Sequence, residues 1–428
     1  MAPGLPSAPV PPPLVKSASR PPDVLRAPGT PAAEVHRAVT AVPRADTVQW
    51  NVVAVGGVLL CGGAVALWAA YGLRHGALFL VGAGCGIALH HAAFGFTAAY
   101  RALVTTGDGR GFRAQLLMLA VATVLFAPVL AAGRGLGIEA GGALAPAGVS
   151  VLVGAFIFAI GMQLGGGCGS GTLFHLGSGR APLAVTLVGF LAGSVIATFH
   201  MPFWWSLPSL GEVSLGRALG WTPAVGLQLA VLGFIALVSL RHDPSRAAGM
   251  HPASPISLQL RVVRGPWPLA AGAVALAVLN LATLLVAGHP WTITWAFSLW
   301  GGKILQAAGV DLSSTPFWTG EFQRAALAAP VFADVTSIMD IGLVLGAGLA
   351  AGLAGGFGSA RRVPLRLVVA GLSGGLLLGY GARIAYGCNI GAMFSGIAST
   401  SLHGWLWGAA ALLGTPVGVR LRRLLRGD

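Results

Sequence analysis

Long runs of apolar residues recur along the chain from residue 50 onward, and the segments between them carry most of the charged residues. About 20 consecutive apolar residues are enough to cross a bilayer as a helix. None of the runs alternates apolar and polar positions as a β-barrel strand does. We therefore expect an all-α polytopic membrane protein. Its apolar segments are Trp50–Tyr71, Ala77–Tyr100, Leu116–Ala132, Ala147–Leu164, Pro182–Phe203, Pro223–Leu240, Pro268–Ala287, Trp291–Ala308, Val331–Ala354, Leu367–Tyr386 and Trp405–Val419.

The composition supports this class of protein. The 428 residues are 55% hydrophobic and 9% charged, whereas a soluble domain has about 25% charged residues. The net charge of +14 comes from tails and loops, where contact with anionic lipid explains it without a nucleic-acid partner. The 4 cysteines lie in apolar or glycine-rich surroundings, so we expect no disulfide framework, no metal site and no cofactor.

Lysines and arginines gather near the ends of the segments, and the positive-inside rule assigns such clusters to the cytoplasm. This places both termini inside, in the cytoplasmic (inner) membrane of a bacterium. An even number of crossings must then separate Arg264 from Arg361, so Trp291–Ala308, which contains Lys303, is predicted to be a partial or re-entrant helix. The predicted divisions are a disordered proline-rich cytoplasmic tail at 1–47, a first transmembrane repeat at 48–242, a basic cytoplasmic linker at 243–265 and a second repeat at 266–428.

One short motif occurs twice, around Cys168 and around Cys388. A shift of 220 positions that superposes these cysteines also superposes four other pairs of identical residues, namely Gly161 on Gly381, Gly167 on Gly387, Gly171 on Gly391 and Phe174 on Phe394. A matched cysteine is unexpected by chance in a chain with only 4 cysteines, so we infer an internal duplication. Counting crossings places Cys168 toward the inner side and Cys388 toward the outer side. The copies therefore run in opposite senses, as in the inverted repeats of transporters.

The glycines of each motif predict a break in a membrane helix, because each glycine costs about 1 kcal/mol relative to alanine. Ser170 or Thr172 is expected to cap a short helix after the first break, and Asn389 after the second. Bare backbone inside a bilayer is tolerated where it lines a cavity, and helix N-termini bind anions. The predicted substrate-binding residues are Gly167, Cys168, Gly169, Ser170, Gly171, Gly387, Cys388, Asn389, Gly391 and Cys85.

The paired cysteines suggest the kind of anion. A neutral thiol is a weak donor with a soft sulfur, which suits a small sulfur-containing anion, and an apolar site keeps it protonated. A membrane sulfurtransferase acting through a Cys persulfide remains an alternative, although such chemistry needs a base and only His175 is near Cys168 in sequence. A non-sulfur anion channel that uses helix dipoles alone is the other. Close helix packing explains many of the other glycines, and Cys61 is interpreted as a small hydrophobe.

The two motifs, Gly167-Cys168-Gly-Ser-Gly171 and Gly387-Cys388-Asn-Ile-Gly391, resemble those of the YeeE/YedE family of sulfur transporters over roughly residues 50–420. The resemblance implies an hourglass-shaped protein that takes up thiosulfate or a related compound, with axial cysteines passing the ion on by thiol hydrogen bonds. Cys168 and Cys388 match two such cysteines. Gly95 stands where the family has a third, with Cys85 ten residues earlier, which leaves other sulfur or selenium species open as substrates. The resemblance also implies a small cytosolic TusA-like sulfur-carrier partner.

Other polar residues within the apolar segments have structural interpretations. Asp340 is expected to pair with Lys303 or an arginine, because a free carboxylate would repel an anion. His90 and His91 are expected to cap or pack.

Overall fold

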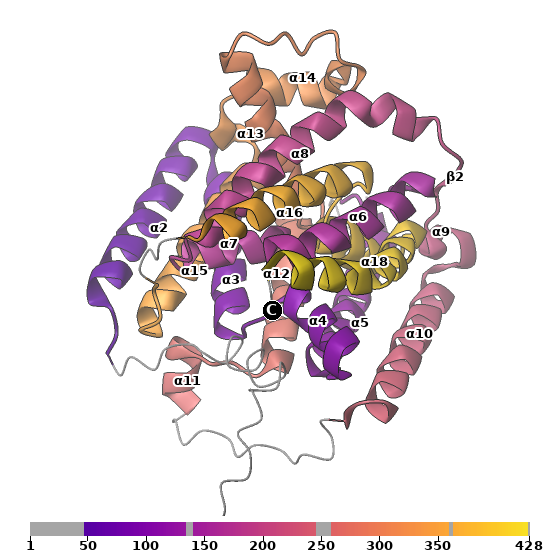
Figure 1. Cartoon of the computed structure of the whole chain (residues 1–428), viewed down its shortest axis with the longest axis horizontal. Helices are drawn as coiled ribbons and strands as arrows, with labels where there is room; N and C mark the ends of the chain where they lie inside the picture. The colour runs from indigo at the N-terminus through magenta and orange to yellow at the C-terminus, as the bar shows by residue number, and fades with distance from the viewer. Residues whose placement is uncertain (1–46, 134–139, 245–257, 359–362, 427–428) are drawn as a thin grey trace, which may run out of the picture. The chain divides into compact units, whose positions relative to one another are not determined.

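A computed structural model of the chain describes residues 47–133, 140–244, 258–358 and 363–426. The described residues belong to one compact unit that is almost entirely helical (Figure 1). The predictions for the tail at 1–46 and for most of the linker, 245–257, lie outside the described residues. In chain order the elements are α2 (Trp50–Tyr71), α3 (Leu73–His91), α4 (Phe96–Thr106), α5 (Arg110–Ala132), β1 (Pro146–Gly148), α6 (Val149–Gly165), α7 (Gly169–Gly177), α8 (Pro182–Trp205), β2 (Ser209–Glu212), α9 (Leu215–Leu219), α10 (Trp221–Arg241), α11 (Leu258–Arg264), α12 (Leu269–Ala287), α13 (Thr294–Ala307), η3 (Pro316–Thr319), α14 (Glu321–Ala328), η4 (Val331–Ala333), α15 (Val335–Leu353), α16 (Leu365–Ile384), η5 (Asn389–Phe394), α17 (Ser395–Ala398) and α18 (Leu402–Arg426).

Nine helical stretches among the described residues are long and apolar enough to cross a membrane. This confirms an all-α polytopic membrane protein. The expected partial segment is α13, whose 14 residues span about 21 Å, less than the hydrocarbon core of about 30 Å. The last predicted segment lies in α18, which has 25 residues but is not among the nine.

The predicted segment Ala77–Tyr100 is not one helix. The α3 helix ends at His91, Ala93 has φ of 46°, and α4 begins at Phe96. This run is apolar on both sides of the turn, so hydropathy carries no sign of the break. Gly95, at the position of the missing family cysteine, is the N-cap of α4.

Backbone-to-backbone packing at small residues holds the central helices together, as is common in membranes. A Cβ at Gly161 of α6 would lie 2.6 Å from the carbonyl oxygen of Gly374 in α16. A Cβ at Gly381 of α16 would lie 2.5 Å from the carbonyl oxygen of Gly154 in α6. These contacts run in opposite directions along the two helices, so α6 and α16 are antiparallel.

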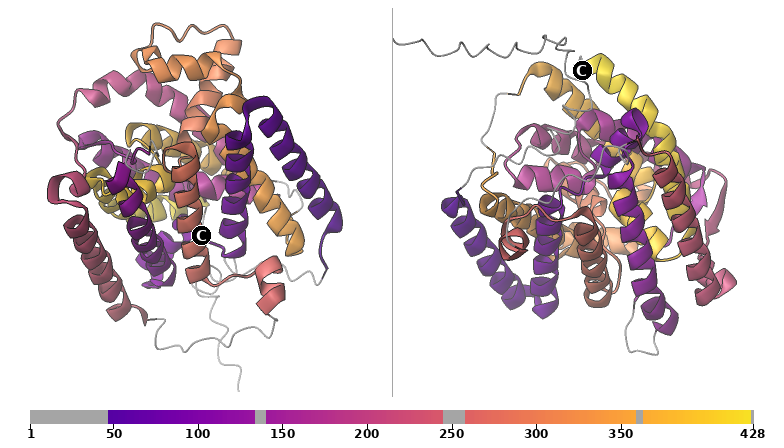
Figure 2. Two further views of the ribbon diagram at one scale, coloured as in Figure 1. Left: turned by 180° about the vertical axis from the view of Figure 1, so that it is seen from behind. Right: turned by 90° about the horizontal axis from the view of Figure 1, so that it is seen from below.

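The helices α2 and α10 lie at opposite edges of the described unit in all three ribbon views (Figures 1 and 2). Their large apolar side chains are exposed, including Val58 and Val65 on α2 and Phe234 and Leu237 on α10. Exposed apolar surface of this extent fits contact with lipid tails.

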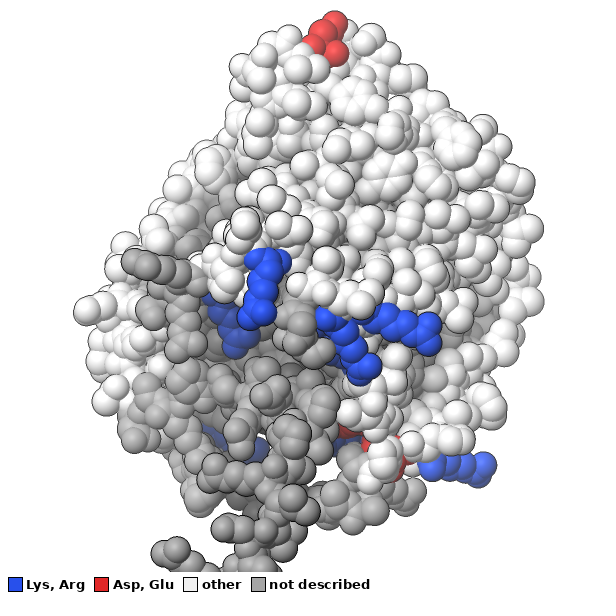
Figure 3. Space-filling view, in the orientation of Figure 1, with Lys and Arg blue, Asp and Glu red and all other residues white. Residues whose placement is uncertain are grey.

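A basic loop joins α4 to α5 and lies against the end of α10. Arg113 at the start of α5 forms an ion pair of 2.7 Å with Asp243, just after α10. Nearby, a hydrogen bond from Arg110 holds the pKa of Asp108 below its usual range. On the face of the molecule drawn in Figure 3, lysine and arginine side chains lie in the middle and lower parts, and none lies near the top.

Candidate functional site

Both copies of the motif interrupt a helix, as predicted from their glycines. The first break follows α6, where Gly166 has φ of 84°, and α7 begins at Gly169. The second follows α16, where Tyr386 and Gly387 have φ of 60° and 153°, and the π-helix η5 begins at Asn389. Each broken helix therefore presents the N-terminus of a new short helix in the protein interior.

The first break is capped by Cys168 itself. Its Sγ accepts a hydrogen bond from the backbone N–H of Gly171 at 3.3 Å and shares one with Ser170 Oγ at 3.4 Å. Its carbonyl oxygen accepts from both the N–H and the Oγ1 of Thr172 at 2.8 Å. The expectation that Ser170 or Thr172 would cap this helix is wrong, because the helix begins earlier and both residues fall within its first turn.

The second break starts at Cys388, which has no side-chain cap bond. Its carbonyl oxygen accepts from the N–H groups of Ala392 at 3.0 Å and Met393 at 3.4 Å, the wider spacing of a π-helical turn. Asn389 was expected to cap, but it lies inside the turn and is fully buried. Its amide oxygen and nitrogen make no hydrogen bond of good geometry in the described part of the chain, and the Tyr100 hydroxyl is the polar group within reach of it. A buried amide without partners is costly, so this group is available to a ligand.

Side chains from other helices take up the carbonyl groups that the breaks release. Thr186 Oγ1 donates to the carbonyl of Gly165 at 3.1 Å. Trp407 Nε1 donates to the carbonyl of Gly387 at 3.1 Å. Sequence reasoning missed both residues, because neither lies near a motif in the sequence.

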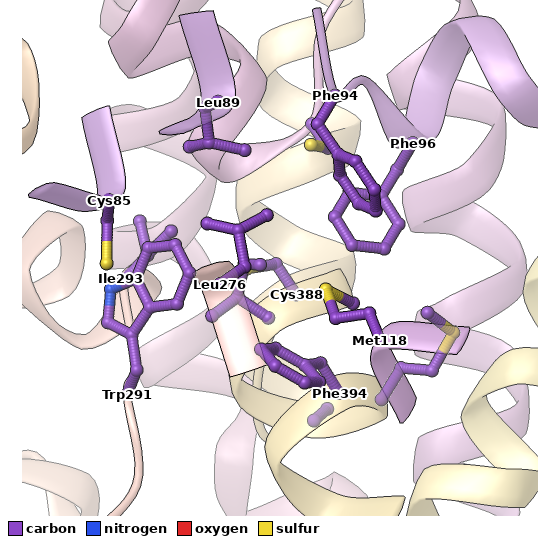
Figure 4. Close-up of a cluster of buried hydrophobic side chains, with 14 of the residues drawn as sticks. Cys85, Leu89, Phe94, Phe96, Met118, Leu276, Trp291, Ile293, Cys388 and Phe394 are labelled. Atoms are coloured by element: carbon purple, nitrogen blue, oxygen red, sulfur yellow. The ribbon is translucent and has the colours of Figure 1, made fainter. Parts of the chain in front are cut away.

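The structure brings the two motifs together. A Cβ at Gly169 would lie 3.1 Å from Cys388 Sγ, and both cysteines are buried. Cys388 and Met118 belong to the same central cluster of buried side chains, which Figure 4 shows. We expected the cysteines to be separated toward the two sides of the membrane, but their loops adjoin.

The short helices leave this point toward opposite ends of the molecule. Beyond α7, the carbonyl of Ser178 accepts from the N–H of Gly358, which follows α15. Beyond α17, Ser399 Oγ accepts from the N–H of Ala143, close to the end of α12. Two helix N-termini, with the partial positive charge they carry, therefore meet near the two thiols.

Tyr100 is a further residue of this site that the sequence did not reveal. It is 1% exposed, and its hydroxyl donates to Met393 Sδ at 3.1 Å. It also lies within interaction range of Cys168 and Asn389. Because the apolar run that contains Tyr100 breaks unexpectedly, its position on α4 could not be assigned to either motif.

The other two cysteines, and Gly95 at the position of the third family cysteine, differ in how buried they are. Cys85 on α3 is fully buried in the same cluster as Cys168 and Cys388, and Figure 4 shows it near Trp291. Cys61 on α2 is exposed. A Cβ at Gly95 would meet only Ala98, at 3.8 Å, so a side chain fits there.

The predicted pairing of Asp340 with Lys303 is wrong. Lys303 Nζ instead donates to the carbonyls of Leu327 at 2.8 Å and Ala329 at 2.6 Å. Neither carboxylate oxygen of Asp340 has a hydrogen-bond partner among the described residues. His90 Nδ1 bonds to Ser178 Oγ at 3.0 Å, and the ring centroids of His91 and Trp267 lie 5.4 Å apart.

Comparison with known proteins identifies the family to which the chain belongs. Residues 91–417 match the family model described as sulphur transport. The probable transporter YedE of Salmonella typhimurium is 32% identical over 164 residues, which cover 37% of this chain and 38% of that protein, well under half of its length. The thiosulfate transporter TsuA of Spirochaeta thermophila is 28% identical over 348 residues, covering 78% of this chain and 95% of that protein. TsuA of Escherichia coli is 22% identical over 333 residues, covering 76% and 87%. With the family model spanning most of the chain and the motif cysteines meeting between broken membrane helices, this chain belongs to the sulphur transport (YeeE/YedE) family of multi-pass membrane proteins.

Proposed function

We propose that this protein takes up thiosulfate, or a closely related small sulfur-containing anion, across the bacterial cytoplasmic membrane. The observation that carries the proposal is the meeting of Cys168 and Cys388 at two broken-helix N-termini. The relatives named thiosulfate transporters support this class of substrate. The anion passes from one thiol to the other by hydrogen bonding, and neither sulfur becomes covalently modified.

The energetics of the site suit a dianion in transit. Moving an ion out of water costs several kcal/mol or more per charge. Each helix N-terminus returns about 0.5–2 kcal/mol, and the unpartnered amide of Asn389 adds a donor. The thiols supply further weak donors. A pathway needs binding that is weak enough for release, which thiols satisfy better than fixed cations do.

An inverted repeat with halves at 48–242 and 266–428 would explain how the pathway opens to each side in turn. The reciprocal glycine contacts support it. A shift of 220 residues turns the Gly161–Gly374 contact into the Gly154–Gly381 contact, as a two-fold axis between α6 and α16 requires. The helix pairs α8–α16 and α6–α18 are related in the same way, as are α2–α15 and α5–α12.

The proposed orientation follows from charge, and the proposed partner follows from the family resemblance. The basic end near Arg113 is assigned to the cytoplasm by the positive-inside rule, with both termini inside. A small TusA-like sulfur-carrier protein that meets the released anion there remains part of the proposal.

The sulfurtransferase alternative has less support. A persulfide-forming cysteine needs a neighbouring base, and the partners of Cys168 Sγ are Gly171 N–H and Ser170 Oγ. The His175 ring instead lies tilted against the Phe174 ring, with 4.0 Å between the ring centroids, and is within electrostatic range of Arg180 and His90.

The experiment is uptake of radiolabelled thiosulfate by a host that lacks its own uptake systems, with growth on thiosulfate as sole sulfur source as a second readout. Cys168→Ser and Cys388→Ser should each lower uptake at least tenfold, the effect of about 1.4 kcal/mol. Cys61→Ser, at an exposed position, is the matched control. Unchanged uptake in both motif variants would favour a dipole-only channel, and a turnover-competent persulfide detected by mass spectrometry would favour the sulfurtransferase.

A further inference from the structure

Asp340 lies on α15 in the middle of the protein, and nothing yet described uses it. It is 0% exposed, and both carboxylate oxygens lack a hydrogen-bond partner in the described part of the chain. An ionised carboxylate in such surroundings is so unfavourable that it takes up a proton or a cation. We propose that Asp340 is a proton-binding site and that its protonation couples anion uptake to an inward proton flux. This inference rests on the proposed function.

A polar column leads from the surface toward Asp340. Asp334 caps α15, and Trp295 Nε1 donates to its Oδ1 at 2.9 Å. Ser337 donates to Asp334 Oδ2 through its N–H at 2.8 Å and its Oγ at 2.7 Å. Trp300 Nε1 in turn donates to Ser337 Oγ at 2.8 Å. Residues 334, 337 and 340 follow one face of the helix, about 9 Å in all.

The upper part of this column opens to the outside of the protein. Trp300 and Lys303 line a surface pocket of ≈ 340 Å³ together with Ile304, Ala307 and Val331. A proton that enters this pocket first reaches the Ser337–Asp334 pair, because the indole N–H of Trp300 only donates and cannot pass a proton on. Asp340 lies one helical turn beyond Ser337. No hydrogen bond joins the two among the described residues, so the last step of the proposed route requires the Asp340 side chain to move or a water molecule to enter.

The inner end of the route meets the anion site. Asp340 lies within electrostatic range of the thiols of Cys85 and Cys388. An ionised Asp340 repels an anion beside Cys388, whereas a protonated Asp340 does not. Anion and proton therefore favour each other's binding, and this coupling is reciprocal by thermodynamic necessity. The proton comes from the outer solution with the anion and leaves to the cytoplasm with it.

Among the residues that the structure describes, no cation lies within electrostatic range of Asp340. The titratable groups within electrostatic range of Asp340 are Cys85 from α3, Cys388 from the second break and Asp334 from its own helix. Charged and titratable groups on the other neighbouring elements are engaged elsewhere or face outward: Lys303 of α13 with Leu327 and Ala329, His175 of α7 with Arg180 and His90, Tyr71 of α2 with His75, Cys61 of α2 at the exposed surface and Arg261 of α11 with Pro266.

Two further observations favour a proton over a structural role or a metal cation. The shift of 220 that aligns the motifs places Ala120 of α5 at the position of Asp340, so the corresponding helix packs without a carboxyl group. Hard cations bind to several oxygen ligands at once. In the described residues, no group of three or more His, Cys, Asp or Glu side chains could hold a metal ion.

The full chain, reconstituted in proteoliposomes with the voltage clamped, tests the proposal with thiosulfate as probe. An acid-outside gradient of one pH unit should drive about tenfold accumulation per coupled proton. Asp340→Asn should still equilibrate thiosulfate but show no gradient-driven accumulation. Asp311→Asn, at a fully exposed carboxylate, is the matched control and should accumulate as the unmodified protein does.

The outcomes separate the two levels of the proposal. If the unmodified protein moves no thiosulfate under any gradient, the proposed function fails. If thiosulfate accumulates without regard to the pH gradient, follows a sodium gradient, or keeps its pH response in Asp340→Asn, the function stands and the proton site is overturned.

If a variant reconstitutes poorly into liposomes, a binding measurement tests the proposal instead. Calorimetric titration of the detergent-solubilised protein with thiosulfate, in buffers of different ionisation enthalpy, counts the protons taken up per anion. With the titration repeated over a range of pH, we expect net proton uptake in the unmodified protein at the alkaline end, where Asp340 is ionised before the anion binds, and none in Asp340→Asn at any pH. Equal proton uptake in the two proteins would overturn the proposal.

Discussion

The backbone of Gly169 lies against the thiol of Cys388, so that a Cβ on Gly169 would stand 3.1 Å from Cys388 Sγ. Gly169 is the first residue of α7, and Cys388 immediately precedes η5. The N-terminus of one short helix therefore meets the cysteine of the other motif. Glycine at this position is what allows the two helix breaks to approach each other.

Gly169→Ala should lower thiosulfate uptake severalfold, because the added methyl group displaces the Cys388 thiol while leaving both cysteines in place. Gly233→Ala is the control, since a Cβ there meets nothing within 4 Å. Initial uptake rates at matched expression would check the prediction. A Gly169→Ala protein that transports as fast as the control would mean that the thiol has room to move.

The second prediction concerns how much the cap at each helix break contributes to stability. Cys168 Sγ accepts a cap bond from Gly171 N–H, whereas Cys388 makes no side-chain cap bond. Cys168→Ala should therefore lose up to about 1 kcal/mol more stability than Cys388→Ala, since losing an N-cap costs about 0.5–2 kcal/mol.

Cys168→Ser should keep the cap through its hydroxyl and unfold near the temperature of the unmodified protein, even though its transport falls. Thermal unfolding in detergent measures all three variants. Equal destabilisation by the two alanine variants would show that the Gly171–Cys168 bond contributes little.

The parts of the fold that could be predicted from the sequence are those that depend on local composition. Hydropathy located α2 to the residue, and the glycine runs located both helix breaks. The sequence did not show which side chain caps each break, because the cap depends on the residue at which the new helix begins. Cys168 occupies that position, whereas Ser170 lies two residues later, inside the first turn.

Long-range relations were hidden for a different reason. Tyr100, Thr186 and Trp407 reach the site from other helices, and an apolar membrane sequence carries little pattern to show which helix faces point inward. That the Asp340 carboxylate has no hydrogen-bond partner among the described residues could not be predicted either, because Lys303 was the simplest partner by charge. That lysine finds two backbone carbonyls much nearer to it.

The missing third cysteine leads to a prediction of gained function. Gly95 has φ of −114°, and a Cβ there would meet only Ala98 at 3.8 Å. Its neighbours Phe94 and Phe96 are buried in the cluster that contains Cys388. Gly95→Cys should therefore fold normally and raise thiosulfate uptake by adding a donor along the path.

Gly95→Ala is the matched control, because it fills the same space without a thiol. Both variants are measured by uptake at subsaturating thiosulfate. An increase in the alanine variant as well would assign the gain to packing, and no gain in either would mean that the path does not pass Gly95.

The reciprocal packing of α6 and α16 makes the last prediction. A Cβ would lie 2.6 Å from the Gly374 carbonyl in Gly161→Ala and 2.5 Å from the Gly154 carbonyl in Gly381→Ala. Each substitution forces the same two helices apart, so each should cost about 1–3 kcal/mol, and the two costs should be similar if a two-fold axis relates them. Gly226→Ala on α10, where a Cβ meets nothing within 4 Å, should instead be neutral or stabilise by up to about 1 kcal/mol. Thermal unfolding of the three variants measures this, and a large cost at one glycine with none at the other would argue against the inverted repeat.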